Sequence, residues 1–103
     1  MLFVSFEPDN STYAGVIATS TATQGKSFVL FIDTLPSTTC TLSAPGHTLP
    51  LGKSPDEAMD PGAPSFLTRW GKDWAVGPST VTVTCTWAGQ TARAYKDVSI
   101  TAP

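Results

Sequence analysis

The segment Thr80-Val81-Thr82-Val83-Thr84-Cys85-Thr86-Trp87 alternates strictly between threonine and a nonpolar side chain. Successive side chains of a β-strand point to opposite faces, so this pattern predicts a strand with one buried face and one wet face. Val81, Val83 and Cys85 are expected to face the core. Because Trp87 shares their parity, we expect its indole to lie in the core as well.

A β-hairpin is predicted around this strand. Gly77-Pro78 marks a turn before it, and Ala88-Gly89-Gln90 marks a turn after it. A second strand is expected from Thr91 to Thr101, but Lys96 falls on its nonpolar face. Two explanations are open: Lys96 lies at the margin of a sheet, or a bulge near Tyr95-Lys96-Asp97 shifts the register.

Further strands are predicted upstream. Ser27–Asp33 is nonpolar on both faces, which is typical of a central strand covered on both sides. Residues 44–64 contain five prolines and three glycines, so we expect a long loop with one short strand around Leu49-Leu51. About seven strands, with turns roughly every 8–12 residues, predict one all-β, immunoglobulin-like sandwich spanning residues 1–103. The remaining segments with strand character are Leu2–Phe6, Tyr13–Thr19, Thr38–Ser43, Ser65–Trp70 and Trp74–Val76.

Composition excludes two classes of partner. Only 14% of the 103 residues are charged, the formal net charge is −2, and the six lysines and arginines are scattered. A surface that follows phosphates needs clustered cations, so we expect no nucleic-acid binding. No nonpolar run approaches the length of a membrane span, so no membrane insertion is expected. We expect a monomer that contacts neighbouring domains of a longer chain.

The two cysteines, Cys40 and Cys85, predict one disulfide, although two free buried thiols remain the alternative. They lack the Cys-x-x-Cys spacing of a zinc site, and the single histidine, His47, cannot complete a metal tetrad with them. Such a disulfide persists in an oxidising compartment. We therefore expect an extracellular location, at a cell surface or on a virion, and no metal or other cofactor.

The C-terminal hairpin resembles that of bacterial immunoglobulin-like and PKD-like modules, which occur in tandem on secreted and surface proteins. The resemblance rests on residues 77–85, on Gly89 and on the final Val98-Ser99-Ile100-Thr101-Ala102-Pro103. It implies a sandwich that serves as a spacer or adhesion module. From the strand pattern we expect about seven antiparallel strands, and we expect the domain to be cut from a longer chain.

The cysteine positions depart from an antibody-type domain. Ser27–Asp33, the candidate second strand, has no cysteine, and Cys40 falls one strand later. If Cys85 lies on the sixth strand, the disulfide joins the third and sixth strands, which neighbour each other in one sheet. We therefore expect a bond within a sheet, where an antibody-type domain has a bond between sheets.

Two clusters are candidate binding sites. Trp70 and Trp74, with Arg69 and Asp73 beside them, could stack against and hydrogen-bond a sugar; the alternative is that both indoles serve packing. An acidic group in the predicted loop could bind calcium, or it could be a solvated loop without a calcium-binding pattern. Its members are Asp56, Glu57 and Asp60.

No catalytic residue is identified. His47 is the only conventional general base, and no serine or cysteine stands beside it in a nucleophile motif. The sequence therefore predicts a non-enzymatic extracellular module that acts as a spacer, an adhesion domain or a protein-interaction domain. The alternative is a carbohydrate-binding module attached to a secreted hydrolase, with a glycan ligand in place of a protein partner.

Overall fold

The computed structural model describes residues 1–6, 21–56 and 65–103, and these residues form an all-β fold, as predicted. They contain eight strands in two sheets, where about seven were expected. The predicted strand Tyr13–Thr19 lies outside the described residues. The strands are β1 (Val4–Phe6), β2 (Thr21–Thr23), β3 (Phe28–Thr34), β4 (Thr39–Ala44), β5 (His47–Lys53), β6 (Phe66–Trp70), β7 (Gly77–Trp87) and β8 (Gln90–Thr101).

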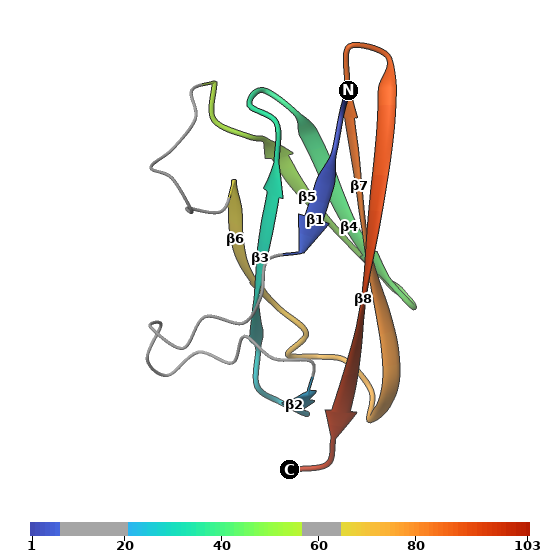
Figure 1. The fold of residues 1–103 in the computed structure, drawn as a ribbon. Coiled ribbons are helices and arrows are strands. Elements are labelled where there is room, and N and C mark those ends of the chain that lie inside the picture. The colour runs from blue at the N-terminus through green and yellow to red at the C-terminus, as the bar shows by residue number, and fades with distance from the viewer. Residues whose placement is uncertain (7–20, 57–64) are drawn as a thin grey trace.

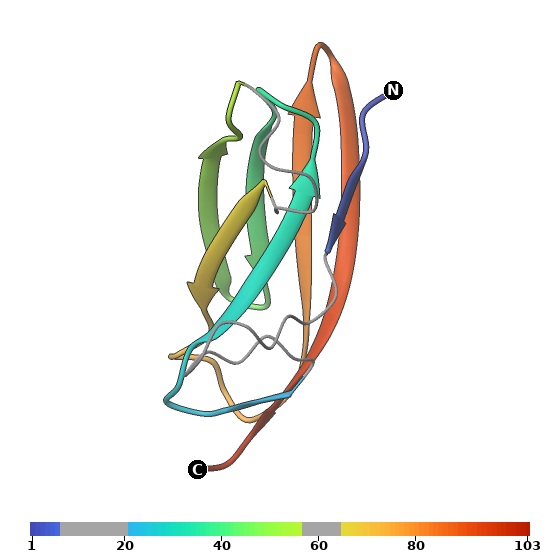
Figure 2. The same cartoon turned by 60° about the vertical axis from the view of Figure 1, so that its left-hand side comes forward.

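The two sheets form two layers (Figures 1 and 2). The smaller has the strand order β1-β3-β6, and the larger has the order β2-β8-β7-β4-β5. Every pairing is antiparallel except that of β2, which runs parallel to the end of β8. The expectation of purely antiparallel strands was therefore wrong. Thr21-Ala22-Thr23 is too short to carry a periodic signal, and only its place beside Ser99–Thr101 makes it a strand.

Strand β3 is the central strand of the smaller sheet, as its two nonpolar faces predicted. Its residues Phe28 to Ile32 are all buried. Phe28, Leu30 and Ile32 point into the main core between the sheets, while Val29 and Phe31 form a second buried cluster. The main core also contains Leu2 near the N-terminus, Trp74 between β6 and β7, and residues of the larger sheet: Ala22, Cys40, Leu42, Val81, Val83, Cys85, Val98 and Ile100.

Strand β7 places Val81, Val83 and Cys85 in the core, with no exposed surface on any of them. The prediction for Trp87 was wrong, since this side chain is 36% exposed. Its parity is the expected one, but the β7–β8 hairpin extends beyond the strands of the facing sheet (Figures 1 and 2). The face of β7 that buries Val83 and Cys85 is therefore less covered at Trp87.

The β7–β8 ladder also decides between the two explanations for Lys96. Its register runs without a shift from Gly77 opposite Ile100 to Trp87 opposite Gln90, so the bulge near Tyr95-Lys96-Asp97 does not exist. Lys96 lies opposite Val81 and is half-buried, while Val98 and Ile100 further along the same face are buried. The inward face of β8 is therefore buried towards the C-terminus and only half-buried nearer the hairpin turn.

The proline-rich middle of the chain is more regular than expected. A turn at Pro45-Gly46 connects β4 to β5, and β5 covers His47–Lys53, where only a short strand around Leu49-Leu51 was predicted. Pro50 lies within β5, the outermost strand in the order of the larger sheet. Proline lacks an N–H and is tolerated on such a strand. In contrast, Trp74–Val76 is not a strand, because β7 begins only at Gly77.

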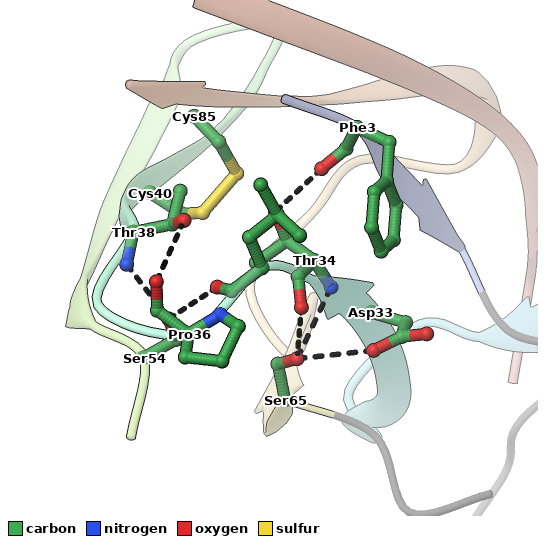
Figure 3. The surroundings of a disulfide bond; sticks show 10 residues. Phe3, Asp33, Thr34, Pro36, Thr38, Cys40, Ser54, Ser65 and Cys85 are labelled. Atoms are coloured by element: carbon green, nitrogen blue, oxygen red, sulfur yellow. Dashed lines mark hydrogen bonds between the residues drawn. A yellow bond between two sulfur atoms is a disulfide. The ribbon is translucent and has the colours of Figure 1, made fainter. Parts of the chain in front are cut away.

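A disulfide joins Cys40 of β4 to Cys85 of β7, which excludes the alternative of free thiols (Figure 3). The two cysteines are cross-strand partners in one sheet, with 4.1 Å between their Cα atoms. The prediction of a bond within a sheet is confirmed. The strands are the fourth and seventh, because β2 adds one to the expected count.

A buried serine closes the connection between β3 and β4 near this disulfide (Figure 3). Ser54 Oγ accepts a hydrogen bond from the Thr38 amide and donates one to the Leu35 carbonyl, both at 2.8 Å. The Ser54 amide also donates to the Thr38 carbonyl at 2.8 Å. Since a buried polar group without a partner is costly, these bonds stabilise the chain reversal that leads into the disulfide-bearing strand.

Candidate functional site

A hollow of about 290 Å³ lies where β5 begins, at His47, and where β6 ends, at Trp70. Its lining residues are Ser27, His47 and the continuous run from Arg69 to Trp74. The structure therefore brings together the four residues selected from sequence as a candidate glycan site. It adds Ser27 and His47, which come from distant parts of the chain and could not be assigned to this place from local patterns.

Aromatic rings form the inner part of this pocket. Trp74 is 2% exposed and makes edge-to-face contacts with Phe28, at 5.3 Å between ring centroids, and with Trp70, at 4.7 Å. The His47 ring stacks on Trp74 at 5.7 Å, with 25° between the planes. Trp74 is thus a packing residue, while the half-buried Trp70 remains accessible at the pocket. The planes of the two indoles are 76° apart, so they do not form a flat stacking platform.

The turn between the two tryptophans depends on Gly71. Its φ of +96° is disfavoured for other residues, and a Cβ there would lie 2.1 Å from Cε1 of Phe28. The Trp74 amide donates to the Gly71 carbonyl at 3.1 Å, and the Gly25 amide donates to the Lys72 carbonyl at 3.2 Å. These contacts place the polar residues of the turn at the mouth of the pocket and the indole of Trp74 beneath it.

Three charged residues line the pocket. Arg69, Lys72 and Asp73 are all exposed, and none of them takes part in an ion pair among the described residues. Trp70 lies opposite Phe28 and Arg69 opposite Val29, so the Arg69 side chain leaves β6 on the face away from the Trp70 indole. A pocket with a half-buried indole, one lysine and one carboxylate can bind a small polar ligand that has a nonpolar face.

The acidic cluster is represented only by Asp56, because Glu57 and Asp60 lie outside the described residues. Ser37 Oγ donates a hydrogen bond to Asp56 Oδ1 at 2.7 Å, and Lys53 Nζ lies 3.6 Å from the same oxygen. The hydrogen bond from Ser37, and then the positive charge of Lys53, lower the pKa of the Asp56 carboxyl below its usual value. Asp56 therefore has its own partners within the chain.

Residues 1–6, 21–56 and 65–103 contain no group of three or more histidine, cysteine, aspartate or glutamate side chains arranged to hold a metal ion. Nor do they contain a helix long and nonpolar enough to cross a membrane. Comparison of the chain with protein-family models, curated proteins and solved structures gave no match.

Proposed function

We propose that the chain is an immunoglobulin-like module, a finer assignment than the all-β sandwich itself. The strand arrangement supports it. The strands of such domains are named by letters in chain order. Strands A, B and E share one sheet, and strands C, F and G share the other. Variable-type domains add strand C′ beside C. The order β1-β3-β6 against β8-β7-β4-β5 corresponds to A-B-E against G-F-C-C′. In this assignment β2 is a second part of the first strand that has moved to the other sheet.

The disulfide is where the chain departs from this class. In antibody domains the bond joins strands B and F across the core, whereas Cys40 and Cys85 lie on the strands that correspond to C and F. The inward positions of β3 are filled by Phe28, Leu30 and Ile32 instead of a cysteine. A buried disulfide of this kind is compatible with an oxidising compartment, which supports an extracellular location for the module.

We infer that the module acts as a non-enzymatic mechanical spacer between neighbouring domains. One observation carries this inference: the two chain ends lie at opposite ends of an elongated molecule (Figures 1 and 2). Its principal extents are 42 × 29 × 17 Å. A domain with this geometry adds its full length to a chain of domains in series and transmits tension along its long axis.

The direction of the terminal strands supports resistance to such tension. β1 and β8 run along the long axis, each paired antiparallel with a neighbour, β3 and β7 respectively (Figure 1). Hydrogen bonds between strands are perpendicular to the strands, so tension along the axis loads all bonds of a ladder together. The disulfide additionally fastens β7, the partner of β8, to β4.

Single-molecule force spectroscopy tests this function. The domain would be pulled from its two ends within a chain of reference domains. In the control, it would be pulled through the cross-strand pair Pro78 and Ser99, which opens β7 from β8 one rung at a time. We expect a clearly higher unfolding force from the ends than through the pair. An equal or lower force from the ends would contradict a load-bearing role.

The same experiment reports on the disulfide. Cys40 and Cys85 are separated by 45 residues, which stay folded into a closed loop while the bond is intact. Reduction of the bond should therefore lengthen the extension released on unfolding by roughly 150 Å, at about 3.4 Å per residue. An unchanged extension would mean that the bond is absent under the conditions of the experiment.

Carbohydrate binding is the second candidate function, and the pocket at Trp70 supports it. Stacking of a sugar on two parallel exposed indoles is not favoured, because Trp74 is buried and its plane is steeply inclined to that of Trp70. What supports this candidate is a small pocket with one accessible indole and charged residues at its mouth.

A further inference from the structure

The charged side chains beside Trp70 cancel, and this narrows the kind of ligand that the pocket can hold. Lys72 and Asp73 line it with opposite charges, whereas the Arg69 side chain leaves β6 on the other face of the smaller sheet. Lys72 and Asp73 both belong to the turn that follows β6, so a charged ligand meets one group that attracts it and one that repels it. The pocket therefore favours an uncharged polar ligand.

Five polar side chains around the pocket have no hydrogen bond or ion pair with any other described residue. They belong to Ser27, His47, Trp70, Lys72 and Asp73. The Lys72 ammonium and the Trp70 N–H can only donate, the Asp73 carboxylate can only accept, and the Ser27 hydroxyl can do both. A sugar hydroxyl also donates and accepts, so neighbouring hydroxyls of one ring can satisfy the donors and the acceptor together.

The indole of Trp70 supplies a nonpolar contact. It is half-buried and packs edge-to-face on the buried Trp74, with 4.7 Å between the ring centroids. Trp74 is held in turn by Phe28 and by the stacked ring of His47. These contacts orient the Trp70 indole before a ligand arrives, so less conformational entropy is lost on binding. The C–H face of a pyranose ring can pack on the accessible part of the indole.

We propose that this pocket binds one uncharged pyranose residue at the end of a glycan. The inference rests on the second candidate function and names its ligand class. Asp73 would accept hydrogen bonds from adjacent sugar hydroxyls, Lys72 would donate to another, and the ring would pack on Trp70. The volume of about 290 Å³ is at the lower end of the range for small-molecule pockets, which suits one sugar ring better than several.

An acidic sugar fits the pocket less well than the matching neutral sugar. Its carboxylate would lose water on binding, and Asp73 would offset the attraction by Lys72. A hexose and its uronic acid differ only at the last carbon atom, where a carboxylate replaces a hydroxymethyl group. Each such pair therefore compares the uncharged and the charged class on one ring.

Chemical-shift titration of the ¹⁵N-labelled full chain tests the assignment. The probes are the methyl glycosides of glucose, galactose and mannose, each beside the methyl glycoside of its uronic acid. We expect saturable shifts of the Gly71, Lys72 and Asp73 amides and of the Trp70 indole N–H with at least one neutral sugar. The indole N–H of Trp87, which lies outside the pocket, should not shift. The matching uronic acid should bind several-fold more weakly.

Two carboxylate variants give a matched comparison. Asp73→Ala removes the lining carboxylate, and Asp97→Ala removes an exposed carboxylate from β8, outside the pocket. Asp73→Ala should weaken neutral-sugar binding by about tenfold, in line with the usual contribution of a hydrogen bond to a charged group. It also leaves Lys72 without an opposing charge, so the uronic acid should gain relative to the hexose. Asp97→Ala should change neither result, and both positions are exposed, so both variants should fold.

Each other outcome overturns the inference in a distinct way. Equal or tighter binding of a uronic acid to the parent chain would leave carbohydrate binding in place but refute the uncharged class. Binding that shifts Trp87 and not Trp70, or that is unchanged in Asp73→Ala, would refute this site. No binding of any sugar would refute both the uncharged class and the second candidate function, and it would leave the spacer function to the force experiment.

Discussion

Replacement of Gly71 by alanine should destabilise the fold far more than the same replacement at Gly25. Both glycines have a positive φ, +96° and +88° respectively. A Cβ at Gly25 meets no atom within 4 Å, whereas a Cβ at Gly71 would lie 2.1 Å from the Phe28 ring. Gly25→Ala therefore reports the cost of the backbone conformation alone, about 1–2 kcal/mol. Gly71→Ala adds a steric clash to that cost.

The size of the added effect follows from the surroundings of Phe28. Its ring is fully buried and packs edge-to-face on Trp74, so it has little room to move away from a new methyl group. Overpacking of a core costs about 1–3 kcal/mol. At about 4–8 °C per kcal/mol for a domain of this size, Gly71→Ala should melt roughly 5–20 °C below Gly25→Ala.

Thermal unfolding followed by tryptophan fluorescence is a suitable measurement, because Trp74 is buried in contact with Phe28. A double-mutant cycle adds a direct test of the clash. Phe28→Leu removes the ring, so Gly71→Ala should cost less in that background than in the parent chain. Equal stability of Gly71→Ala and Gly25→Ala, or strictly additive effects in the cycle, would refute this account of the turn.

Three further predictions concern the disulfide, a buried hydroxyl and an exposed carboxyl. Cys40→Ala combined with Cys85→Ala should lower the free energy of unfolding in urea by about 4 kcal/mol, given a separation of 45 residues; a loss below 1 kcal/mol would contradict this. Ser54→Ala leaves the Thr38 amide without its side-chain acceptor and should cost about 1–3 kcal/mol in the same assay, whereas an unchanged midpoint would refute it. The pKa of Asp56 is lowered in the folded chain, so its stabilising effect is present above the usual carboxyl pKa and is lost as the pH falls through the folded value. Asp56→Asn should therefore melt slightly below the parent chain at pH 7 and equally at pH 2, and a difference that persists at pH 2 would exclude this cause.

Sequence periodicity predicted the elements whose two faces differ clearly. The alternation of Val81, Val83 and Cys85 with threonines identified β7 and its buried face, and the nonpolar run at residues 28–32 identified β3 as a central strand. The same rule failed at Trp87. Parity determines the face of a sheet on which a side chain lies, but burial also requires a second layer opposite that position.

Sequence periodicity did not predict the short strand β2 or the full length of the proline-containing strand β5. Thr21–Thr23 becomes a strand only through its parallel pairing with the end of β8. His47–Lys53 contains Pro50 and Gly52, which predict a loop, yet the pairing with β4 maintains a strand of seven residues. In both cases pairing with a neighbouring strand outweighs the local preference of the chain; the partner is distant in sequence for β2 and is the preceding strand of a hairpin for β5.

The amino-acid sequence alone determined the all-β class and the selection of residues 69–74 as a polar and aromatic cluster, since these follow from composition and from residues close together in the chain. It predicted the disulfide between Cys40 and Cys85 but left two free thiols as the alternative, which the structure excludes. Only the tertiary structure decided that Trp74 is buried while Trp70 stays accessible, and that His47 and Ser27 join them. The physical reason is that the pocket forms where β5, β6 and the turn at Gly71 converge, and convergence of distant segments leaves no periodic signal in any one of them.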